Sequence, residues 1–278
     1  MAPRPGEAKS GGELRLRIVT GTVLGATGLF AVLAGGPWFA LLVALVALGM
    51  SLELARLLEA ARERRRRLRL LLLLGTLPGV MAPAVLPLGW ALLLLAWGAG
   101  FAAAVRRLWG ETAGPAALGV VYLGLPLALL VWLRQGWAEG AWLTLWLLLV
   151  VAATDMGGYT VGRSLGGPKL APRLSPAKTW SGLAGAAAFG SLSGLLAAWG
   201  LPDLPFPPLW AALFGGVLAL VAQLGDLTES WLKRRAGFKD SGRLLPGHGG
   251  LLDRFDGLLA ASPLYAITVS WLEMGRSP

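Results

Sequence analysis

The sequence has 278 residues, of which 55% are hydrophobic and only 14% are charged, and its formal net charge is +10. Soluble globular domains usually have about 45–50% apolar and about 25% charged residues, so this composition excludes an ordinary soluble fold. The chain contains no cysteine, which excludes disulfides and thiolate chemistry.

Uncharged runs are long enough to cross a membrane repeatedly. Residues 18–52 and 70–105 carry no charged side chain, and each run suits two helices of about 20 apolar residues. The turns within these runs are expected near residues 35–37 and 81–88, where Gly and Pro gather. We therefore predict an all-α, polytopic helical bundle with about nine spans. Glycines and prolines interrupt the third span, so counts of eight and ten stay open. The predicted spans are residues 16–34, 38–57, 68–84, 88–105, 115–133, 141–162, 180–200, 208–227 and 257–273.

The distribution of basic residues indicates the orientation of these spans. With the N-terminus in the cytoplasm, 23 of the 25 Lys and Arg residues fall on the cytoplasmic side, and only Arg134 and Arg276 fall outside. Short cytoplasmic loops are enriched in these residues, so the asymmetry supports nine spans with the C-terminus outside the cytoplasm. The expected location is the inner (plasma) membrane, as a multi-pass protein. The net charge is then mostly a topology signal facing an anionic leaflet, and no nucleic-acid partner is expected. The arginine run at residues 62–69 is interpreted in the same way, with specific binding of a lipid or partner as the alternative.

The domain organisation is expected to be simple. Residues 1–13 are predicted to form a short cytoplasmic tail, and the first apolar run is too long for a cleaved signal peptide. Residues 14–278 are predicted to form a single transmembrane domain. Small residues at 182–185 and 190–194 permit close helix contact within one chain or between two, which is compatible with a homodimer.

Two glycine-rich, basic cytoplasmic loops, residues 162–179 and 228–256, are the expected place for chemistry. Each adjoins a helix that carries an acid near its cytoplasmic end, Asp155 for the first loop and Asp226 for the second. A carboxylate at membrane depth is costly and indicates a functional site. The plainer alternative is that Asp155 pairs with a base or caps backbone within the bundle.

Further acids are expected to converge on the same cytoplasmic mouth. Glu229 and Lys233 continue the helical face of Asp226 at i+3 and i+7. Asp253 and Asp256 share a face of the last helix if that helix starts near residue 252. Clustered carboxylates repel one another unless a cation lies among them, and oxygen ligands suit Mg²⁺. Helix capping is the alternative, but it explains only one of the last two acids.

Basic side chains interleaved with glycines supply the opposite charge in the second loop. Backbone N–H groups at glycines can approach phosphate oxygens closely, and Lys and Arg add charge-assisted hydrogen bonds. Carboxylates that hold Mg²⁺ beside such bases are what phosphoryl or nucleotidyl transfer requires. The bases concerned are Lys233, Arg234, Lys239, Arg243 and Arg254.

A pattern of fixed positions runs through this loop. It reads Ser230-x-Leu232-Lys233-Arg234-x₄-Lys239-Asp240-x-Gly242-x₂-Leu245-Pro246-x-His248-Gly249-Gly250-Leu251-x-Asp253-Arg254-Phe255-Asp256. The pattern resembles the signature of the phosphatidate cytidylyltransferases, also called CDP-diacylglycerol synthases. Residues 155–163 resemble the acid-aromatic-glycine segment of that family, and residues 175–182 resemble its Ser-Pro-Lys-Lys-Thr stretch. Ala177 departs from that stretch at its first lysine, which puts an essential role for that lysine in doubt.

The resemblance implies that phosphatidate attacks the α-phosphorus of CTP, that pyrophosphate leaves, and that CDP-diacylglycerol forms for phospholipid biosynthesis. The transmembrane domain at residues 14–278 is then expected to be catalytic, with its active site in its C-terminal half, in about residues 150–257. The implied partners are CTP, phosphatidate and membrane lipids. The implied Mg²⁺ ligands are Asp226 and Asp253, neither of which has an evident salt-bridge partner, and a second cation is compatible. The implied catalytic residues are Asp226, Asp253, Asp256, Lys239 and His248, the last as a phosphate donor or an orienting group. The implied substrate-binding residues are Asp155, Ser175, Lys178, Lys233, Arg234 and Arg254.

Other functions are compatible with parts of this pattern. Another CTP-using membrane lipid enzyme of the lipid kinase type would share the charged loop. A CDP-alcohol transferase would show D-G-x₂-A-R, and residues 256–261 lack that arginine. A transporter of anionic metabolites would show two matching halves with charges at the midplane, whereas the charges here cluster on one side. A purely structural scaffold gives no reason for the converging acids.

Overall fold

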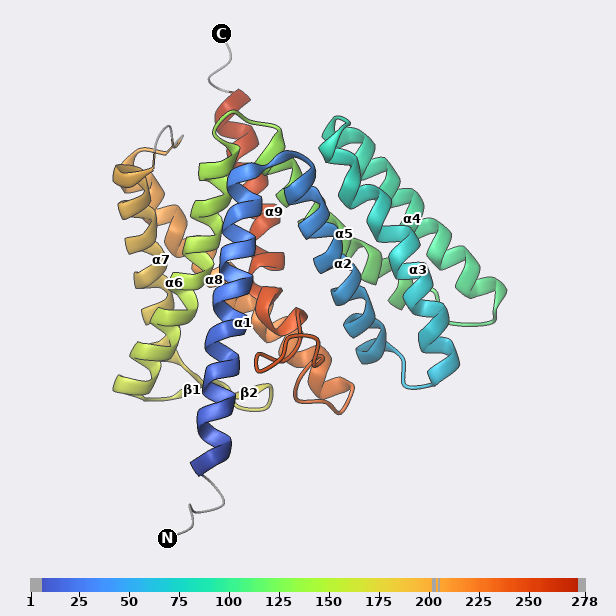
Figure 1. Ribbon diagram of the computed structural model, residues 1–278, viewed down its shortest axis with the longest axis horizontal. Coiled ribbons are helices and arrows are strands. Elements are labelled where there is room, and N and C mark those ends of the chain that lie inside the picture. The colour runs from blue at the N-terminus through green and yellow to red at the C-terminus, as the bar shows by residue number, and fades with distance from the viewer. Residues whose placement is uncertain (1–6, 202–203, 205, 275–278) are drawn as a thin grey trace.

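The computed structural model describes residues 7–201, 204 and 206–274, and it is a helical bundle (Figure 1). Nine α-helices run through this part of the chain, and the only strands in it form one small antiparallel hairpin. The helices are α1 (Glu7–Ala34), α2 (Gly36–Leu58), α3 (Arg62–Met81), α4 (Leu88–Leu108), α5 (Gly114–Gln135), α6 (Gly140–Leu165), α7 (Trp180–Gly200), α8 (Pro208–Arg235) and α9 (Leu252–Met274). A 3₁₀ turn, η1 (Ala82–Ala84), follows α3, and the strands are β1 (Lys169–Ala171) and β2 (Ser175–Thr179).

The predicted all-α polytopic membrane bundle is confirmed. By length and composition, 8 helices of the described chain can cross a membrane, and α1 carries a shorter apolar part, Ile18–Ala34. Each of the nine predicted spans falls on one helix. The start of α1 and the end of α9 lie at opposite ends of the bundle, as an odd number of crossings requires (Figure 1).

Two segments outside the predicted spans have regular secondary structure. Residues 7–13 of the predicted tail form the first turns of α1, and residues 1–6 lie outside the described residues. Extending an existing helix adds one hydrogen bond for each residue that is fixed, so an apolar span can carry helical structure into a polar flank. The hairpin is the second such segment, and residues 162–179 were expected to be a loop.

The glycines that weakened the third predicted span are contact points between helices. A Cβ on Gly98 would collide with the Gly75 backbone, and one on Gly75 would lie 3.1 Å from the Gly98 carbonyl oxygen, so α3 and α4 approach at backbone distance there. A Cβ on Gly79 would collide with Leu95 of α4. Small residues thus serve packing in α3 rather than breaking it.

The glycines of α7 make their close contacts within the chain. Gly182 and Gly185 face α6, where a Cβ on either would crowd the carbonyls of Gly158 and Gly157 respectively. Gly190 and Gly194 face α8 and would clash there with Gly215 and Ala211. The spacing that is compatible with a homodimer is therefore used between helices of one chain.

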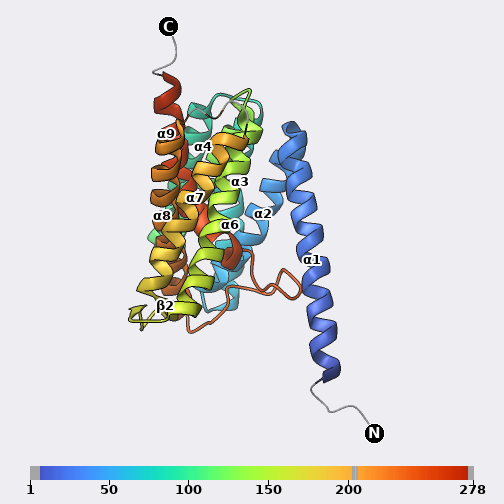
Figure 2. The same cartoon turned by 90° about the vertical axis from the view of Figure 1, so that its left-hand side faces the viewer.

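Helix α1 lies to one side of the bundle (Figure 2) and is tied to it at its C-terminal end. Arg134, at the end of α5, donates from Nε to the Val32 carbonyl and from Nη2 to the Leu33 carbonyl at 3.0 Å. Gln135 Nε2 donates to the Gly36 carbonyl at 3.0 Å. One of the two bases predicted outside the cytoplasm therefore caps a helix end.

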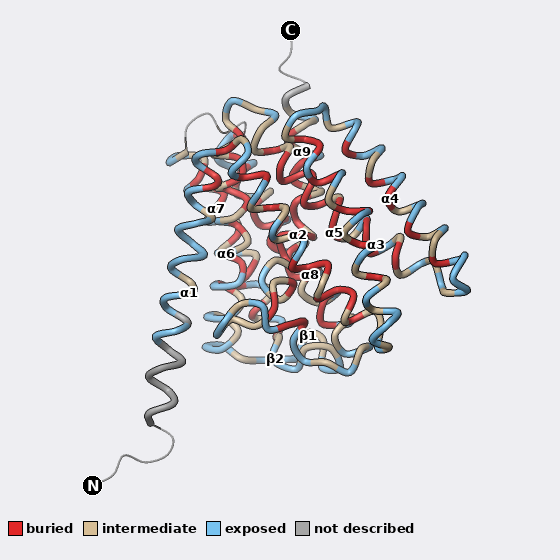
Figure 3. The backbone as a smooth tube through the Cα atoms, turned by 45° about the vertical axis from the view of Figure 1, so that its right-hand side comes forward, coloured by how far each residue is buried: buried red, intermediate tan, exposed pale blue. Residues whose placement is uncertain are grey.

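Buried residues lie through the middle of the bundle, whereas the outward faces of α1 and α4 are exposed (Figure 3). Trp146 of α6 and Tyr265 of α9 are fully buried, and their ring centroids are 5.4 Å apart. The Tyr265 hydroxyl donates to the Leu143 carbonyl at 3.0 Å. This contact fixes α6 against α9, and both helices carry acids at their other ends.

Candidate active site

Helices α8 and α9 approach at backbone distance next to their acids. A Cβ on Gly225 would collide with the Asp256 carbonyl, and one on Gly257 would lie 3.2 Å from the Ala222 Cβ. Gly225 immediately precedes Asp226, and Gly257 immediately follows Asp256. The two glycines therefore bring carboxylates that are 30 positions apart in sequence to one place.

The hairpin holds the two shorter sequence motifs together. Gly166 and Gly167 have φ values of 62° and 105°, a conformation that glycine adopts readily, and they turn the chain out of α6. Thr179 caps α7, because its Oγ1 accepts a hydrogen bond from the Gly182 amide at 3.1 Å. The Ser181 hydroxyl donates to the Gly166 carbonyl. The hairpin is thus fixed at both of its ends.

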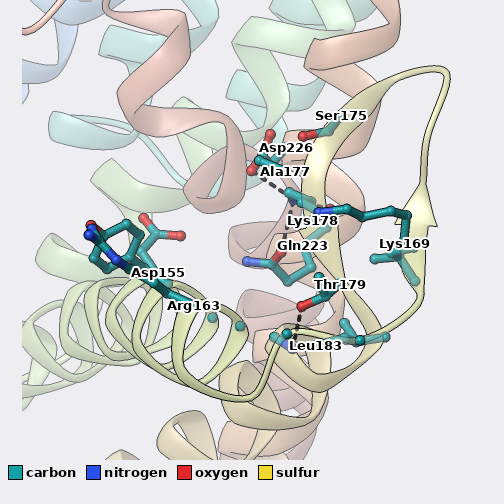
Figure 4. Close-up of a pocket in the computed structure, with 17 residues that line it drawn as sticks. Asp155, Arg163, Lys169, Ser175, Ala177, Lys178, Thr179, Leu183, Gln223 and Asp226 are labelled. Atoms are coloured by element: carbon teal, nitrogen blue, oxygen red, sulfur yellow. Dashed lines mark hydrogen bonds and ion pairs between the residues drawn. The ribbon is translucent and has the colours of Figure 1, made fainter.

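A pocket of about 600 Å³ lies between α6, the hairpin, the start of α7 and α8 (Figure 4). Four predicted site residues line it: Asp155, Ser175, Lys178 and Asp226. Asp155 lies on α6, across the pocket from Lys178 on β2 and Asp226 on α8 (Figure 4). The other charged residues of the lining are Arg163 and Lys169. Acids and bases therefore share one open cavity.

Lys178 is the central base of this pocket. Its Nζ lies 2.7 Å from Asp226 Oδ2 and donates to Gln223 Oε1 at 2.8 Å. The expectation that Asp226 has no salt-bridge partner is therefore wrong. The partner lies 48 positions away in sequence and reaches Asp226 only because the hairpin folds over α8. Ala177, where the family motif has a lysine, also lines the pocket.

A group of three carboxylates lies beside the pocket. One oxygen each from Asp226, Glu229 and Asp256 can be chosen so that all three lie within 4.8 Å of one another. Glu229 is fully buried, and Lys233 Nζ lies 2.5 Å from its Oε2. Within the described chain, neither oxygen of Glu229 has a hydrogen bond of good geometry. Such an oxygen-rich, incompletely satisfied set suits a hard divalent cation.

Asp253 lies next to this group but is held by other partners. Its Oδ1 lies 2.6 Å from Lys233 Nζ, and its Oδ2 accepts from the Ser241 amide at 3.0 Å and the Gly250 amide at 3.1 Å. The expectation that Asp253 has no salt-bridge partner is therefore also wrong. A cation shared by Asp226 and Asp253 stays a prediction, whereas Asp226, Glu229 and Asp256 are the three acids that the fold groups.

The remaining predicted residues do not line the pocket. Lys239 is exposed in the loop after α8. Arg234 donates to the Leu174 carbonyl at 3.3 Å, which ties α8 to the hairpin. Arg254 donates to the His248 carbonyl at 2.8 and 3.0 Å. The His248 ring lies beside α1, where a Cβ on Gly21 would be 3.5 Å from its Nε2.

Several polar residues of this region were absent from the predicted site, among them the pocket bases Arg163 and Lys169. Glu229 carried a signal, its i+3 spacing from Asp226, but was given no role. Gln223 lies three residues before Asp226 and could have been found in the same way. Glu53 lies near the end of α2 and had only the weak signal of an acid that directly follows an uncharged run.

The fold and this site define a polytopic membrane protein with clustered acids and bases at one end of its bundle. A family model described as the cytidylyltransferase family matches residues 15–272, and the chain belongs to that family. Among its relatives, the phosphatidate cytidylyltransferase of Brucella suis is 40% identical over 263 residues, which cover 91% of this chain and 92% of that protein. The phosphatidate cytidylyltransferase of Bacillus subtilis is 39% identical over 157 residues, 55% of this chain and 56% of that protein.

Proposed function

We propose that this protein is a phosphatidate cytidylyltransferase, which transfers CMP from CTP to phosphatidate and releases pyrophosphate. Family membership and the full-length similarity to the Brucella suis enzyme support the reaction. The observation that carries the proposal is the pocket in which Lys178 faces Asp226 and Asp155, at the end of a membrane bundle. A soluble nucleotide and a lipid headgroup can meet only at such a place.

The side chains of the pocket suit the proposed bond changes. A phosphate oxygen of phosphatidate forms a bond to the α-phosphorus of CTP, and the bond from that phosphorus to the β-phosphate oxygen breaks. No base has to remove a proton, because the attacking oxygen is already an anion. Lys178, Lys169 and Arg163 would orient and neutralise the phosphates within the cavity. Lys233, Arg234 and Arg254 would act from its edge.

The carboxylates fit a resident Mg²⁺, which is part of the proposal. Asp226, Glu229 and Asp256 offer oxygen ligands that lie close together, and Glu229 is buried with Lys233 as its ionic partner. Asp253 would contribute from the adjoining ion pair, and the number of acids leaves room for a second cation. Charge neutralisation on the triphosphate is the chemistry that Mg²⁺ supplies in such sites.

The proposed location is the inner (plasma) membrane, with the site facing the cytoplasm. The 23-to-2 distribution of Lys and Arg supports this orientation. CTP, phosphatidate and membrane lipids are the proposed partners. A homodimer has no further support from the glycines of α7, which pack within the chain.

Purified protein in detergent tests the proposal. Pyrophosphate release is expected only when CTP, phosphatidate and Mg²⁺ are all present. Release without phosphatidate, or none with all three under conditions where the protein is folded, would contradict the function.

A further inference from the structure

The candidate site described above is built by the C-terminal half, yet one acid of the N-terminal half reaches its loop. Glu53 of α2 is 3% exposed. Its Oε2 accepts a hydrogen bond from the Ser241 hydroxyl at 3.0 Å and from the Leu252 amide at 2.9 Å. Within the described chain, no donor reaches its buried Oε1. Its two partners lie 188 and 199 positions away in sequence. Because burying a carboxylate costs free energy, such long-range hydrogen bonds suggest that Glu53 holds the segment that contains these partners in place.

The loop is shaped to receive this side chain. A Cβ on Gly242 would collide with the Glu53 carboxylate, and one on Gly250 would collide with the Ser241 hydroxyl and lie 2.8 Å from Glu53 Oε2. One turn earlier on α2, a Cβ on Gly49 would collide with Leu251. Glycines on both surfaces therefore let the backbone of residues 241–252 close over the carboxylate.

Ser241 connects Glu53 to the acids of the site. The buried Ser241 hydroxyl lies 3.0 Å from Glu53 Oε2 and 2.9 Å from Asp253 Oδ2, and it donates its single proton to one of these carboxylates at a time. The Ser241 amide donates to Asp253 Oδ2 at 3.0 Å. Asp253 in turn binds Lys233 at 2.6 Å, and Lys233 binds Glu229 at 2.5 Å. A continuous series of polar contacts thus runs from α2 to the carboxylate group.

We infer that Glu53 is a positioning residue, which fixes residues 241–252 so that Ser241 orients Asp253 and, through it, Lys233. Glu53 lies outside the lining of the pocket, so it acts on the reaction only through these residues. The inference rests on the proposed function, because it assigns Glu53 to the same reaction.

The kinetic test uses Glu53→Leu and Glu53→Gln in the full-length protein. Misplaced reacting groups lower turnover, so kcat is expected to fall about tenfold to a hundredfold for Glu53→Leu, while KM for CTP and phosphatidate stays within about threefold. Glu53→Gln keeps an oxygen that can accept both hydrogen bonds, so it should retain more of the turnover than Glu53→Leu. An inactive parent protein would refute the proposed function, whereas an active parent with unchanged Glu53→Leu kinetics would refute only this inference.

Ser241→Ala gives a smaller change that reports on the same contacts. If Glu53 acts through Ser241, the Glu53→Gln, Ser241→Ala double variant should lose no more turnover than the worse single variant. If the fold loss of turnover in the double variant equals the product of the two single-variant losses, Glu53 does not act through Ser241.

Hydrogen exchange gives a readout that needs no activity. Amides of residues 241–252 should exchange faster in Glu53→Leu than in the parent, because Leu cannot accept the hydrogen bond from the Leu252 amide. Glu59→Leu is the matched control, since Glu59 caps the C-terminal end of the same helix and pairs with Arg106 instead. Parent-like exchange in Glu53→Leu, or equal changes of kcat and exchange in Glu59→Leu, would overturn the inference.

Discussion

Two clusters of ion pairs lie in this bundle, and they are built differently. The first joins the ends of α2, α3 and α4, where Arg106 Nη2 lies 3.3 Å from Glu59 and 3.3 Å from Glu111. The second joins β2, α8 and α9 through Lys178 and Lys233. The members of the first are Arg64, Arg67, Arg106, Glu59, Glu63 and Glu111. The members of the second are Lys178, Lys233, Asp226, Glu229, Asp253 and Asp256.

The difference lies in charge balance and in the type of base. The first cluster has equal numbers of bases and acids, and its bases are arginines, whose planar fork holds carboxylates in a fixed geometry. The second has four acids for two lysines, and each lysine carries a compact charge on a flexible stem. An excess of acid favours a cation, and a lysine can exchange a carboxylate for a phosphate. The first cluster is therefore suited to holding helices together, and the second to binding substrate.

The largest expected effect is the loss of an acid from the second cluster. Replacing Asp226 or Asp253 by Asn keeps the shape but removes a negative charge. If the acids hold the catalytic cation, turnover should fall about a hundredfold or more, because metal stabilisation of the transition state is worth several kcal/mol. Turnover of purified, monodisperse protein checks this outcome.

Asp240→Asn is the control for both substitutions. Asp240 is exposed in the loop between α8 and α9 and lies outside both clusters, so parent-like turnover is expected. A folded Asp226→Asn protein with near-parental turnover across Mg²⁺ concentrations would remove the proposed cation site.

Replacing the base of the pocket should have the next largest effect. Lys178→Met keeps the length of the side chain but removes the ammonium, so kcat/KM for CTP should fall about tenfold to a hundredfold, as expected for a lost charge-assisted hydrogen bond. Arg173→Met changes an exposed base of the same hairpin that does not line the pocket, and it should leave kcat/KM unchanged. Equal losses in both variants would mean that the overall charge of the hairpin, and not Lys178, matters.

Substitutions in the first cluster should lower the stability of the protein and leave its turnover unchanged. Arg106→Met leaves two largely buried glutamates without their shared partner and should lower the free energy of unfolding by about 3 kcal/mol. Thermal unfolding in detergent measures this loss, with Arg107→Met at the exposed neighbouring position as the control. A drop in turnover per folded molecule comparable to that of Asp226→Asn would erase the distinction between the clusters.

Sequence alone predicts the part of this architecture that depends on uninterrupted apolar length. Every predicted span corresponds to a helix, because about 20 apolar residues have few alternatives to a membrane helix. Asp155, Lys178, Asp226 and Asp256 were named as candidates because charge is rare in this chain. Glu229, Arg163 and Lys169 were not among the predicted site residues. The hairpin at residues 169–179 was missed, because its short strands are polar and are fixed by contacts with α6 and α7.

The pairing of the site residues could not be predicted from spacing. Lys178 meets Asp226, and Lys233 meets Asp253, only after the hairpin and α9 pack onto α8. Glu53 lies in the other half of the chain from its partners. The i, i+3 spacing did place Asp226 and Glu229 on the same face of one helix, because residues three or four positions apart on a helix are neighbours.

Identification of the product formed from an equimolar mixture of CTP and ATP tests the central claim most directly. The purified protein, with phosphatidate and Mg²⁺, should form CDP-diacylglycerol and pyrophosphate in equal amounts and leave ATP unused. A phosphorylated lipid formed together with CDP or ADP would contradict the account and favour a lipid kinase.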